Sequence, residues 1–271
     1  MQMNKGYTKR KILAWRKGRT VPTLDLIARE EPLEIRLNGI PAGLLMQTPG
    51  DEKALAVGYL YTEGLIEDIR EVELIRHCGS GLDPFLTSSV VEVQVKRDIS
   101  GTLSKRPLEW TRSSCGLCSK DAVAEIVRHI KPVKTPLSVT WEIIRGISAK
   151  IEKAQSLFRK TGGTHAVSLV DPSGKILFKG EDVGRHNAMD KVIGKALLAR
   201  YPMGSVFAFL SGRVSYEMVL KAARAGIPII AAVSAPTQMA VDLARRLGIT
   251  LAGFLREEQV NIYTHPRRIN F

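Results

Sequence analysis

The C-terminal half of the chain contains three short, continuously apolar segments that are separated by two helical segments. The apolar segments cover about residues 205–210, 228–233 and 249–254, and the helical segments cover about 215–225 and 237–247. Apolar runs without polar alternation indicate strands that are buried on both faces. Because strands that alternate with helices pair in parallel, this order predicts a three-layer α/β/α domain.

The residues before these strands predict a long helix and then a hairpin. The stretch TWEIIRGISAKIEKAQSLFRKTGG repeats apolar residues at helical spacing until Gly162 and Gly163 end it. The apolar face of this helix consists of Ile144, Ile147, Ile151, Ala154 and Phe158. HAVSLVDPSGKILFKG predicts a hairpin that turns at residues 172–174, and a helix is expected at about 187–200. We assign residues 135–271 to an α/β/α domain with a mixed sheet.

The first half of the chain has an α+β pattern. Asn38-Gly39 joins two strand-like segments in LEIRLNGIPAGLLM and predicts a hairpin, because both residues tolerate a positive φ angle. PGDEKALAVGYLYTEGLI predicts a helix with acidic residues in its first turn, and SSVVEVQVKRD alternates as a half-buried strand does. The prolines of KPVKTPLS favour a boundary there. We assign residues 21–134 to a smaller α+β domain that carries a Cys-x-x-Cys loop.

The charge of the chain is concentrated at one end. The formal charge is +13, and residues 1–20 carry seven Lys and Arg residues without one acid. Such a basic tail suits nucleic acid, membrane headgroups or an acidic protein, but a solvated, partly disordered terminus explains it more simply. No RNA-binding motif occurs elsewhere, so we do not expect nucleic acid as a partner. No apolar run reaches the roughly 20 residues that cross a bilayer, and no secretory signal is visible. We expect a cytoplasmic chain without membrane contact.

Small hydroxyl residues and arginines follow each of the three apolar strands. The segments are SGRVS at 211–215, SAPTQ at 234–238 and REEQ at 256–259. Ligands of open α/β sheets bind beyond the carboxyl ends of the strands, where helix N-termini offer free backbone N–H groups to phosphates. The loop GEDVGRHNAMDK adds Arg185, His186 and Asn187. These residue types are common in ordinary loops, but the expected convergence of Arg185, Arg213 and Arg256 favours an anionic ligand.

Zinc-dependent deaminases use a comparable α/β/α domain with His-x-Glu and Pro-Cys-x-x-Cys motifs. In this chain His165 is followed by Ala166 and Val167 and not by a glutamate. The stretch SAPTQMA stands where the cysteine pair would be, and it contains no thiol. The domain therefore lacks the metal ligands of a deaminase.

Cys115 and Cys118 form a Cys-x-x-Cys pair directly before a predicted helix at 119–130. The chain has only three cysteines, which argues against a disulfide framework. A zinc site of Cys78, Cys115, Cys118 and His129 can be drawn, but the second ligand pair that is typical of structural zinc is missing. A thioredoxin-like redox pair and a buried structural pair are further interpretations.

A reactive, exposed pair of thiols explains the surrounding residues better. The flanking Arg-Ser-Ser and Ser-Lys-Asp segments are polar, and Ser119 and Asp121 are candidates to cap the helix. The helix N-terminus, with Arg112 and Lys120 nearby, would stabilise a thiolate, which is the nucleophilic form of cysteine.

Several stretches together resemble the formate dehydrogenase accessory sulfurtransferase family. These stretches are TPGDEKALAVGYLYTEGLI, RSSCGLCSK, TGGTHAVSL, GEDVGRHNAMDKVIG, LSGRVSYEMVLKAARAGIPIIAAVSAPT and NIYT, which occur in order from about residue 32 to 264. The resemblance implies a maturation factor, typically a homodimer. Members take persulfide sulfur from a cysteine desulfurase and pass it to the molybdenum bis(molybdopterin guanine dinucleotide) cofactor of formate dehydrogenase. It also implies a cytidine-deaminase-like fold for the second domain.

The resemblance assigns roles to residues of this chain. The persulfide-bearing cysteine corresponds to Cys115, and Cys118 would assist or accept sulfur. The cofactor-binding segment corresponds to Phe254, Leu255, Arg256, Glu257, Glu258 and Gln259. Many members have glycine and more basic character after the arginine, so Glu257 and Glu258 depart from the pattern and leave Arg256 as the main cation.

The predicted cofactor contacts outside this segment are Arg185, His186, Arg213 and Ser234. The cofactor is expected as a bound substrate, and no permanently bound metal is expected. The alternative is a cofactor-binding chaperone without sulfur transfer, in which the cysteines serve as a redox or zinc site.

Overall fold

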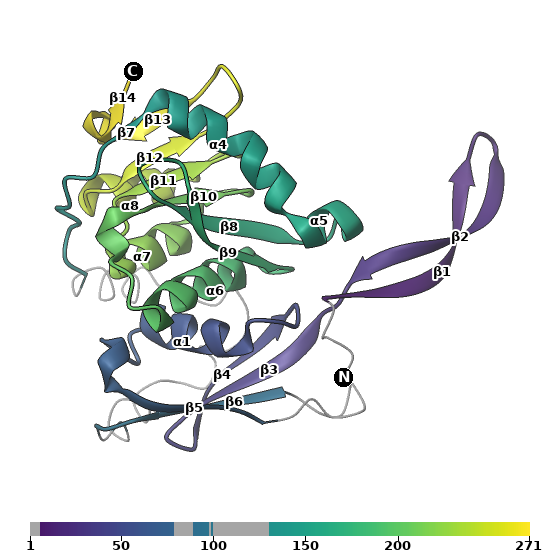
Figure 1. Cartoon of the computed structure of the whole chain (residues 1–271), viewed down its shortest axis with the longest axis horizontal. Helices are drawn as coiled ribbons and strands as arrows, with labels where there is room; N and C mark the ends of the chain where they lie inside the picture. The colour runs from purple at the N-terminus through teal and green to yellow at the C-terminus, as the bar shows by residue number, and fades with distance from the viewer. Residues whose placement is uncertain (1–5, 79–88, 98, 100–129) are drawn as a thin grey trace.

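The computed structural model describes residues 6–78, 89–97, 99 and 130–271. These residues form three parts: a projecting hairpin arm, a four-stranded sheet with one covering helix, and a six-stranded sheet with helices on both faces (Figure 1). The Cys-x-x-Cys pair and the helix predicted at 119–130 lie outside the described residues.

The six-stranded sheet confirms the predicted parallel strands. β10 (Phe207–Leu210), β11 (Ile229–Ala232) and β12 (Thr250–Gly253) pair in parallel. The outer strands are β8 (His165–Val170), β9 (Ile176–Asp182) and β13 (Asn261–Thr264). β8 runs antiparallel to β10 and β9, and β13 runs antiparallel to β12, in the order β13-β12-β11-β10-β8-β9. The sheet is therefore mixed, as predicted.

Helices cover both faces of this sheet. α6 (Arg185–Leu198), α7 (Tyr216–Ala225) and α8 (Gln238–Arg246) pack on one face, and α4 (Trp141–Ala154) packs on the other (Figure 1). Every residue of the three parallel strands is buried, which accounts for their continuous apolar sequence. The predicted three layers are present, whereas the likeness to the cytidine deaminase fold stays a prediction.

The single long helix predicted before β8 is wrong, because two helices occupy this segment. α4 ends at Ala154, Gln155 leaves helical geometry with a ψ angle of 75°, and α5 (Ser156–Thr161) follows. The carboxylate of Glu181 on β9 accepts hydrogen bonds from three backbone N–H groups at the start of α5, so a new helix can begin there. The apolar face is buried at Ile144, Ile147 and Ile151. Phe158, beyond the break, is 43% exposed.

The smaller sheet has the order β4-β3-β6-β5. Its strands are β3 (Glu31–Leu37), β4 (Ile40–Gln47), β5 (Val72–Cys78) and β6 (Ser89–Val95). α1 (Glu52–Thr62) packs on one face of the sheet, and a 3-10 helix (Ile69–Glu71) follows it. The predicted hairpin at Asn38-Gly39 is confirmed, since both residues have positive φ angles, 49° and 79°.

α1 and α6 join the two sheets through a close crossing of glycines. A Cβ atom on Gly58 of α1 would lie 1.9 Å from the Asp190 carbonyl oxygen, and one on Gly194 of α6 would lie 1.8 Å from the Ala54 carbonyl oxygen. Only glycine allows the two helix backbones to approach this closely. Beside the crossing, the buried Lys221 Nζ lies 2.9 Å from the Asp190 carboxylate.

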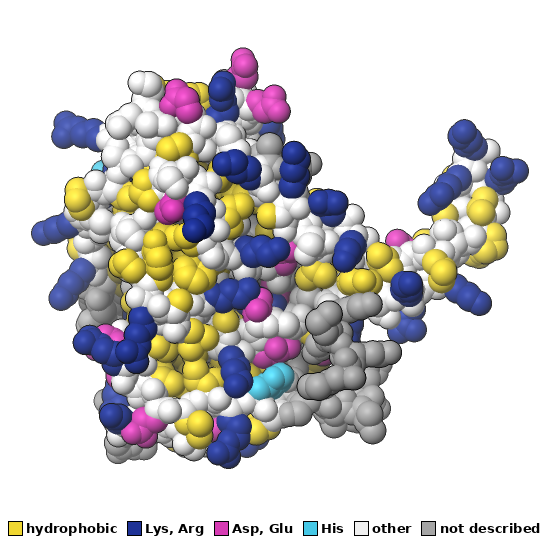
Figure 2. Space-filling view, in the orientation of Figure 1, with side chains coloured by type: hydrophobic (Ala, Val, Ile, Leu, Met, Phe, Trp, Pro, Cys, Tyr) yellow, Lys and Arg dark blue, Asp and Glu magenta, His cyan; other side chains and the backbone are white. Residues whose placement is uncertain are grey.

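The hairpin arm contradicts the expectation of a partly disordered basic tail. β1 (Tyr7–Arg16) and β2 (Arg19–Ala28) pair over their full length and form a separate two-stranded sheet that projects from the molecule (Figure 1). Lys17 and Gly18 both have positive φ angles and make the two-residue turn that suits the strand twist. The boundary placed at residue 20 therefore falls inside β2. Figure 2 shows Lys and Arg side chains along the arm with apolar side chains between them.

Short elements complete the fold. β7 (Val139–Thr140) pairs in parallel with β14 (Ile269–Asn270), and 3-10 helices occupy Met203–Ser205 and Pro266–Arg268. None of the described helices combines the length and the apolar character that crossing a bilayer would take.

Candidate functional site

A cavity of about 920 Å³ lies at the carboxyl ends of the parallel strands. Its walls come from the residues that follow β10, β11 and β12, from the entry to β8 and from the break between α4 and α5. Because β8 is antiparallel to β10, its first residue lies at the same edge as the ends of the parallel strands. This is the edge at which the sequence predicted a ligand.

Five of the predicted cofactor contacts line this cavity: Arg213, Ser234, Leu255, Arg256 and Glu257. Phe254, Glu258 and Gln259 lie in the same loop but do not appear in the described wall of the cavity. The structure thus brings together residues from three separate loops, as the topology predicted.

The loop after β12 is held by its own backbone and by Arg256. The Arg256 N–H donates to the Gln259 carbonyl at 2.8 Å, which closes a tight turn. The Arg256 Nη1 donates to the carbonyl oxygens of Val233 and Leu255, each at 2.8 Å. Arg256 is exposed, so its guanidinium keeps donors for a ligand while two carbonyl groups fix its position.

His165, at the start of β8, lines the cavity. In the sequence it is the histidine of a deaminase-like motif whose glutamate and cysteines are absent. Burial lowers the pKa of His165, and nearby positive charges add to this effect. Those charges belong to Arg185, His186 and Arg213. The imidazole is therefore neutral at neutral pH, although it stands among cations.

Thr164 precedes His165 in the wall and is 5% exposed. Its hydroxyl oxygen is buried and has no hydrogen-bond partner among the described residues. A buried hydroxyl without a partner is costly, so a ligand that bonds to it would remove the cost. The sequence offered one indication, the stretch TGGTH, but not the antiparallel pairing that brings it to the ligand edge.

Arg185 and His186 begin α6 beside the cavity and do not appear in its described wall. The His186 Nε2 lies 2.8 Å from the Glu217 carboxylate. Burial, the largest single effect, would raise the pKa of Glu217, but hydrogen bonds from His186 and Ser215 and the charges of His186 and Arg185 together lower it. The Arg185 Nε is buried and has no partner among the described residues. The two predicted contacts are thus adjacent to the cavity, and one has a free donor.

Asp182, the last residue of β9, positions the turn that leads into Arg185 and His186 at the start of α6. This carboxylate is fully buried. It accepts hydrogen bonds or an ion pair from the backbone N–H groups of Thr48 and Gly184, from the Asn187 amide and from the Lys191 ammonium. Sequence analysis did not identify this role, because one of the partners is more than a hundred residues away.

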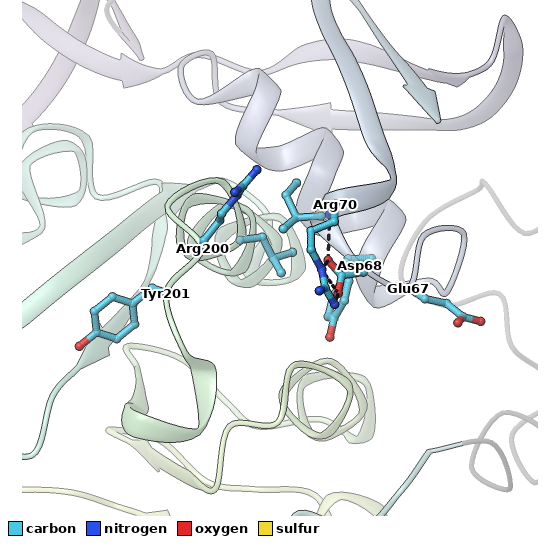
Figure 3. A pocket seen from close by; sticks show the side chains of 8 residues that line it. Glu67, Asp68, Arg70, Arg200 and Tyr201 are labelled. Carbon is cyan, nitrogen blue, oxygen red and sulfur yellow. Dashed lines mark hydrogen bonds and ion pairs between the residues drawn. The ribbon is translucent and has the colours of Figure 1, made fainter. Parts of the chain in front are cut away.

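A second, smaller pocket of about 250 Å³ lies where α1 and α6 end, and it holds none of the predicted residues (Figure 3). Figure 3 shows Arg70 reaching the carboxylate of Asp68 on its wall. The hydrogen bonds from Arg70 lower the pKa of Asp68 to about 2. Its principal charges neutralise each other, so this pocket is a poorer candidate for an anionic ligand.

The predicted sulfur-carrying residues Cys115 and Cys118 lie outside the described residues. The same holds for His129 of the alternative zinc site, whereas Cys78 is an exposed free cysteine at the end of β5.

Comparison with known proteins decides the family of the chain. A family model described as the FdhD/NarQ family matches residues 28–270. The chain belongs to the FdhD/NarQ family.

Individual FdhD/NarQ relatives match nearly the whole chain. The sulfur carrier protein FdhD of Streptomyces coelicolor is 41% identical over 269 residues, which cover 96% of this chain and 95% of the relative. The protein of the same name from Saccharolobus solfataricus is 40% identical over 249 residues, covering 90% and 91%.

A solved structure has the same fold as this FdhD/NarQ chain. A crystal structure from Desulfotalea psychrophila, described as a formate dehydrogenase accessory protein, superposes with a TM-score of 0.79 at 28% identity. The superposition covers 97% of this chain and 99% of the other. The resemblance seen in the sequence is therefore confirmed at the level of the family.

Proposed function

We propose that this chain is a cytoplasmic sulfur carrier that serves formate dehydrogenase. It receives persulfide sulfur from a cysteine desulfurase and passes it to the molybdenum bis(molybdopterin guanine dinucleotide) cofactor. The cofactor is the bound substrate, and the chain acts as a homodimer. The observation that carries this proposal is the cavity at the carboxyl ends of the parallel strands in a member of the FdhD/NarQ family. Arg213 and Arg256 lie on the wall of this cavity. The names of the relatives, sulfur carrier proteins, support it.

The cavity suits one nucleotide end of this substrate. Its volume, about 920 Å³, is at the upper end of the usual range for ligand sites. Arg213 and Arg256 offer fork-shaped donors to a pyrophosphate, and the unpaired hydroxyl of Thr164 needs a polar partner. Glu257 departs from the basic character of the family and repels phosphate. Its carboxylate can instead accept hydrogen bonds from the N–H groups of a guanine base.

The sulfur step is an exchange between sulfur atoms. The Cys115 thiolate attacks the outer sulfur of the donor persulfide, a new sulfur–sulfur bond forms on Cys115, and the bond to the donor cysteine breaks. The donor leaves as a thiolate, so the exchange needs no external oxidant or reductant. Cys118 assists by accepting or releasing the sulfur. In the delivery step the sulfur–sulfur bond on Cys115 breaks, and two electrons from a thiol reductant convert the outer sulfur to the sulfide that the bound substrate takes, which leaves Cys115 as a thiolate.

Mass spectrometry after incubation with cysteine desulfurase and cysteine tests the proposal. We expect one added sulfur on the wild type, no added sulfur on Cys115→Ala, and retained loading on Cys118→Ala. Equal labelling of the wild type and both variants would refute the assignment. Calorimetry with GDP tests the cavity, and Arg213→Ala or Arg256→Ala should weaken binding. A Cys115→Ala variant that still activates formate dehydrogenase would instead favour the chaperone without sulfur transfer.

A further inference from the structure

Among the described residues, the contacts that join the β1–β2 arm to the rest of the molecule lie at its base. There the Lys160 ammonium of α5 lies 5.1 Å from the Tyr7 ring centroid, and the Arg29 N–H donates to the Gly6 carbonyl at 3.0 Å, which extends the pairing of β1 and β2 by one residue on each strand. Ten residues in each strand make a ribbon about 33 Å long. The family model begins at residue 28, the last residue of β2. The arm therefore precedes the part of the chain that the family model describes.

One face of the arm carries a row of exposed apolar side chains. Leu13 is 71% exposed, Trp15 is 72% exposed and Leu24 is 66% exposed. The register pairs Leu13 with Pro22, Trp15 with Thr20 and Lys11 with Leu24, so the three side chains share this face. An isolated two-stranded ribbon is marginally stable in water, and a contiguous exposed apolar patch marks an interaction site. A partner that covers this row would stabilise the arm.

The arm is also strongly basic. Six cations stand against the single carboxylate of Asp25, which gives residues 7–28 a net charge of +5. The cations are Lys9, Arg10, Lys11, Arg16, Lys17 and Arg19. None of them forms an ion pair with another described residue. The rest of the chain is itself positive, at +8, so a second copy does not offer the complementary charge.

The backbone of the arm distinguishes a protein partner from a bilayer. Within the described residues, β1 and β2 hydrogen-bond as strands only to each other, so the outer edges of both carry unpaired N–H and C=O groups. The hydrocarbon of a bilayer cannot satisfy such groups, whereas a protein can pair with them by adding a strand. Nucleic acid would match the cations but leave the Leu13 and Leu24 side chains without apolar contacts.

We propose that the β1–β2 arm is a docking surface for an acidic protein, which covers the row formed by Leu13, Trp15 and Leu24 and pairs its carboxylates with the surrounding cations. The choice of partner rests on the proposed function: the acidic protein is the cysteine desulfurase that supplies the sulfur. Electrostatic attraction speeds such encounters and is weakened by salt.

Biolayer interferometry with purified cysteine desulfurase and purified formate dehydrogenase of the same organism tests the docking surface. One variant replaces the apolar row, Leu13→Ser/Trp15→Ser/Leu24→Ser, and a second reverses charge at the tip, Arg16→Glu/Arg19→Glu. The control, Arg245→Glu/Arg246→Glu, reverses two exposed charges on α8, away from the arm.

We expect at least a tenfold loss of affinity for the cysteine desulfurase in both arm variants. The control should stay within twofold of the wild type, and raising the salt concentration should weaken binding of the wild type. GDP binding should be unchanged in all variants, which shows that they fold. Absence of wild-type binding to the desulfurase, equal binding by the arm variants, or arm-dependent binding to formate dehydrogenase alone overturns the proposal.

Three further measurements test the alternatives to an acidic protein partner: a lipid surface, RNA and a second copy of the chain. Arm-dependent binding to anionic phospholipid vesicles or to tRNA, without a loss of protein binding, overturns the proposal. So does sedimentation equilibrium in which the arm variants fall from dimer to monomer, since a second copy then covers the arm.

Loading of Cys115 by inorganic polysulfide, which needs no docking protein, separates this inference from the proposed function. Arm variants that load from polysulfide but not from the desulfurase support docking. If polysulfide and desulfurase both fail to load the wild type while arm-dependent binding persists, sulfur transfer is wrong and docking stands.

Discussion

The contact between α1 and α6 makes one substitution, Gly58→Ala, a sharp test of how the two sheets are joined. The added Cβ would lie 1.9 Å from the Asp190 carbonyl oxygen, and that oxygen would have to retreat by about 1.5 Å to reach ordinary contact at 3.4 Å. The obstacle is helix backbone and not the end of a flexible side chain, so the helices themselves must separate. The neighbouring α1 and α6 side chains are buried and would lose contacts in the process.

The expected cost follows from two opposing effects. Alanine is a better helix former than glycine by about 0.5–1 kcal/mol, whereas overpacking of a buried site costs about 1–3 kcal/mol and occasionally more. At an overlap this severe, we expect the free energy of unfolding to fall by about 2–3 kcal/mol net. For a chain of this size that corresponds to a decrease in melting temperature of roughly 5–10 °C.

Differential scanning calorimetry of Gly58→Ala and of the control Gly146→Ala measures this difference. Gly146 also lies inside a helix, α4, but it is exposed and a Cβ there meets no atom within 4 Å. The control should therefore melt at the wild-type temperature or slightly above it. The double variant Gly58→Ala/Gly194→Ala should lose less than the sum of the single losses, because both Cβ atoms open the same contact. A Gly58→Ala protein as stable as the control would refute the close crossing.

Three further predictions concern buried or half-buried polar groups. The His165 pKa is below its ordinary value, so the contribution of His165 to stability is largest above pH 6.5 and declines as pH falls toward the lowered pKa. In an NMR titration, the His165 pKa should rise when GDP binds and neutralises the nearby cations. A fall of this pKa on GDP binding would contradict the site. Thr164→Val removes a buried hydroxyl without a partner, so thermal unfolding should show a gain of about 1 kcal/mol while calorimetry shows several-fold weaker GDP binding. Lys221→Met leaves the buried Asp190 carboxylate unpaired and should cost about 3–5 kcal/mol at pH 8 in urea unfolding. Because burial raises the Asp190 pKa, the loss should shrink as pH falls toward 4, and a loss that does not depend on pH would contradict this account.

Local chemistry made much of the fold predictable. The continuous apolar runs identified three parallel strands, since only strands buried on both faces lack polar alternation. Asn38-Gly39 identified its hairpin because both residues adopt positive φ angles at low cost. The convergence of Arg213 and Arg256 followed from topology alone, since parallel strands end at one edge of a sheet.

The features that sequence analysis missed depend on distant residues or on competing signals. The helix break at Gln155 needs the Glu181 carboxylate, which comes from another strand and receives the free N–H groups of α5. Thr164 lies in the site because β8 pairs antiparallel with β10. The residues around Thr164 in the sequence do not indicate this pairing. In the arm, the high positive charge of residues 1–20 suggested a disordered terminus, although Lys17-Gly18 forms the turn between two paired strands.

The crossing of α1 and α6 also determines whether this chain can be divided. A fragment that begins at residue 135 would retain the ammonium of Lys191 but lose the Thr48 carbonyl that lies 2.6 Å from it. It would likewise retain Lys221 without the Thr62 hydroxyl at 2.9 Å, and it would expose the groove at Gly194 to water. Val133 moreover packs in the core of the six-stranded sheet and donates its N–H to the Leu247 carbonyl, so a cut at residue 134 removes contacts that the larger sheet uses.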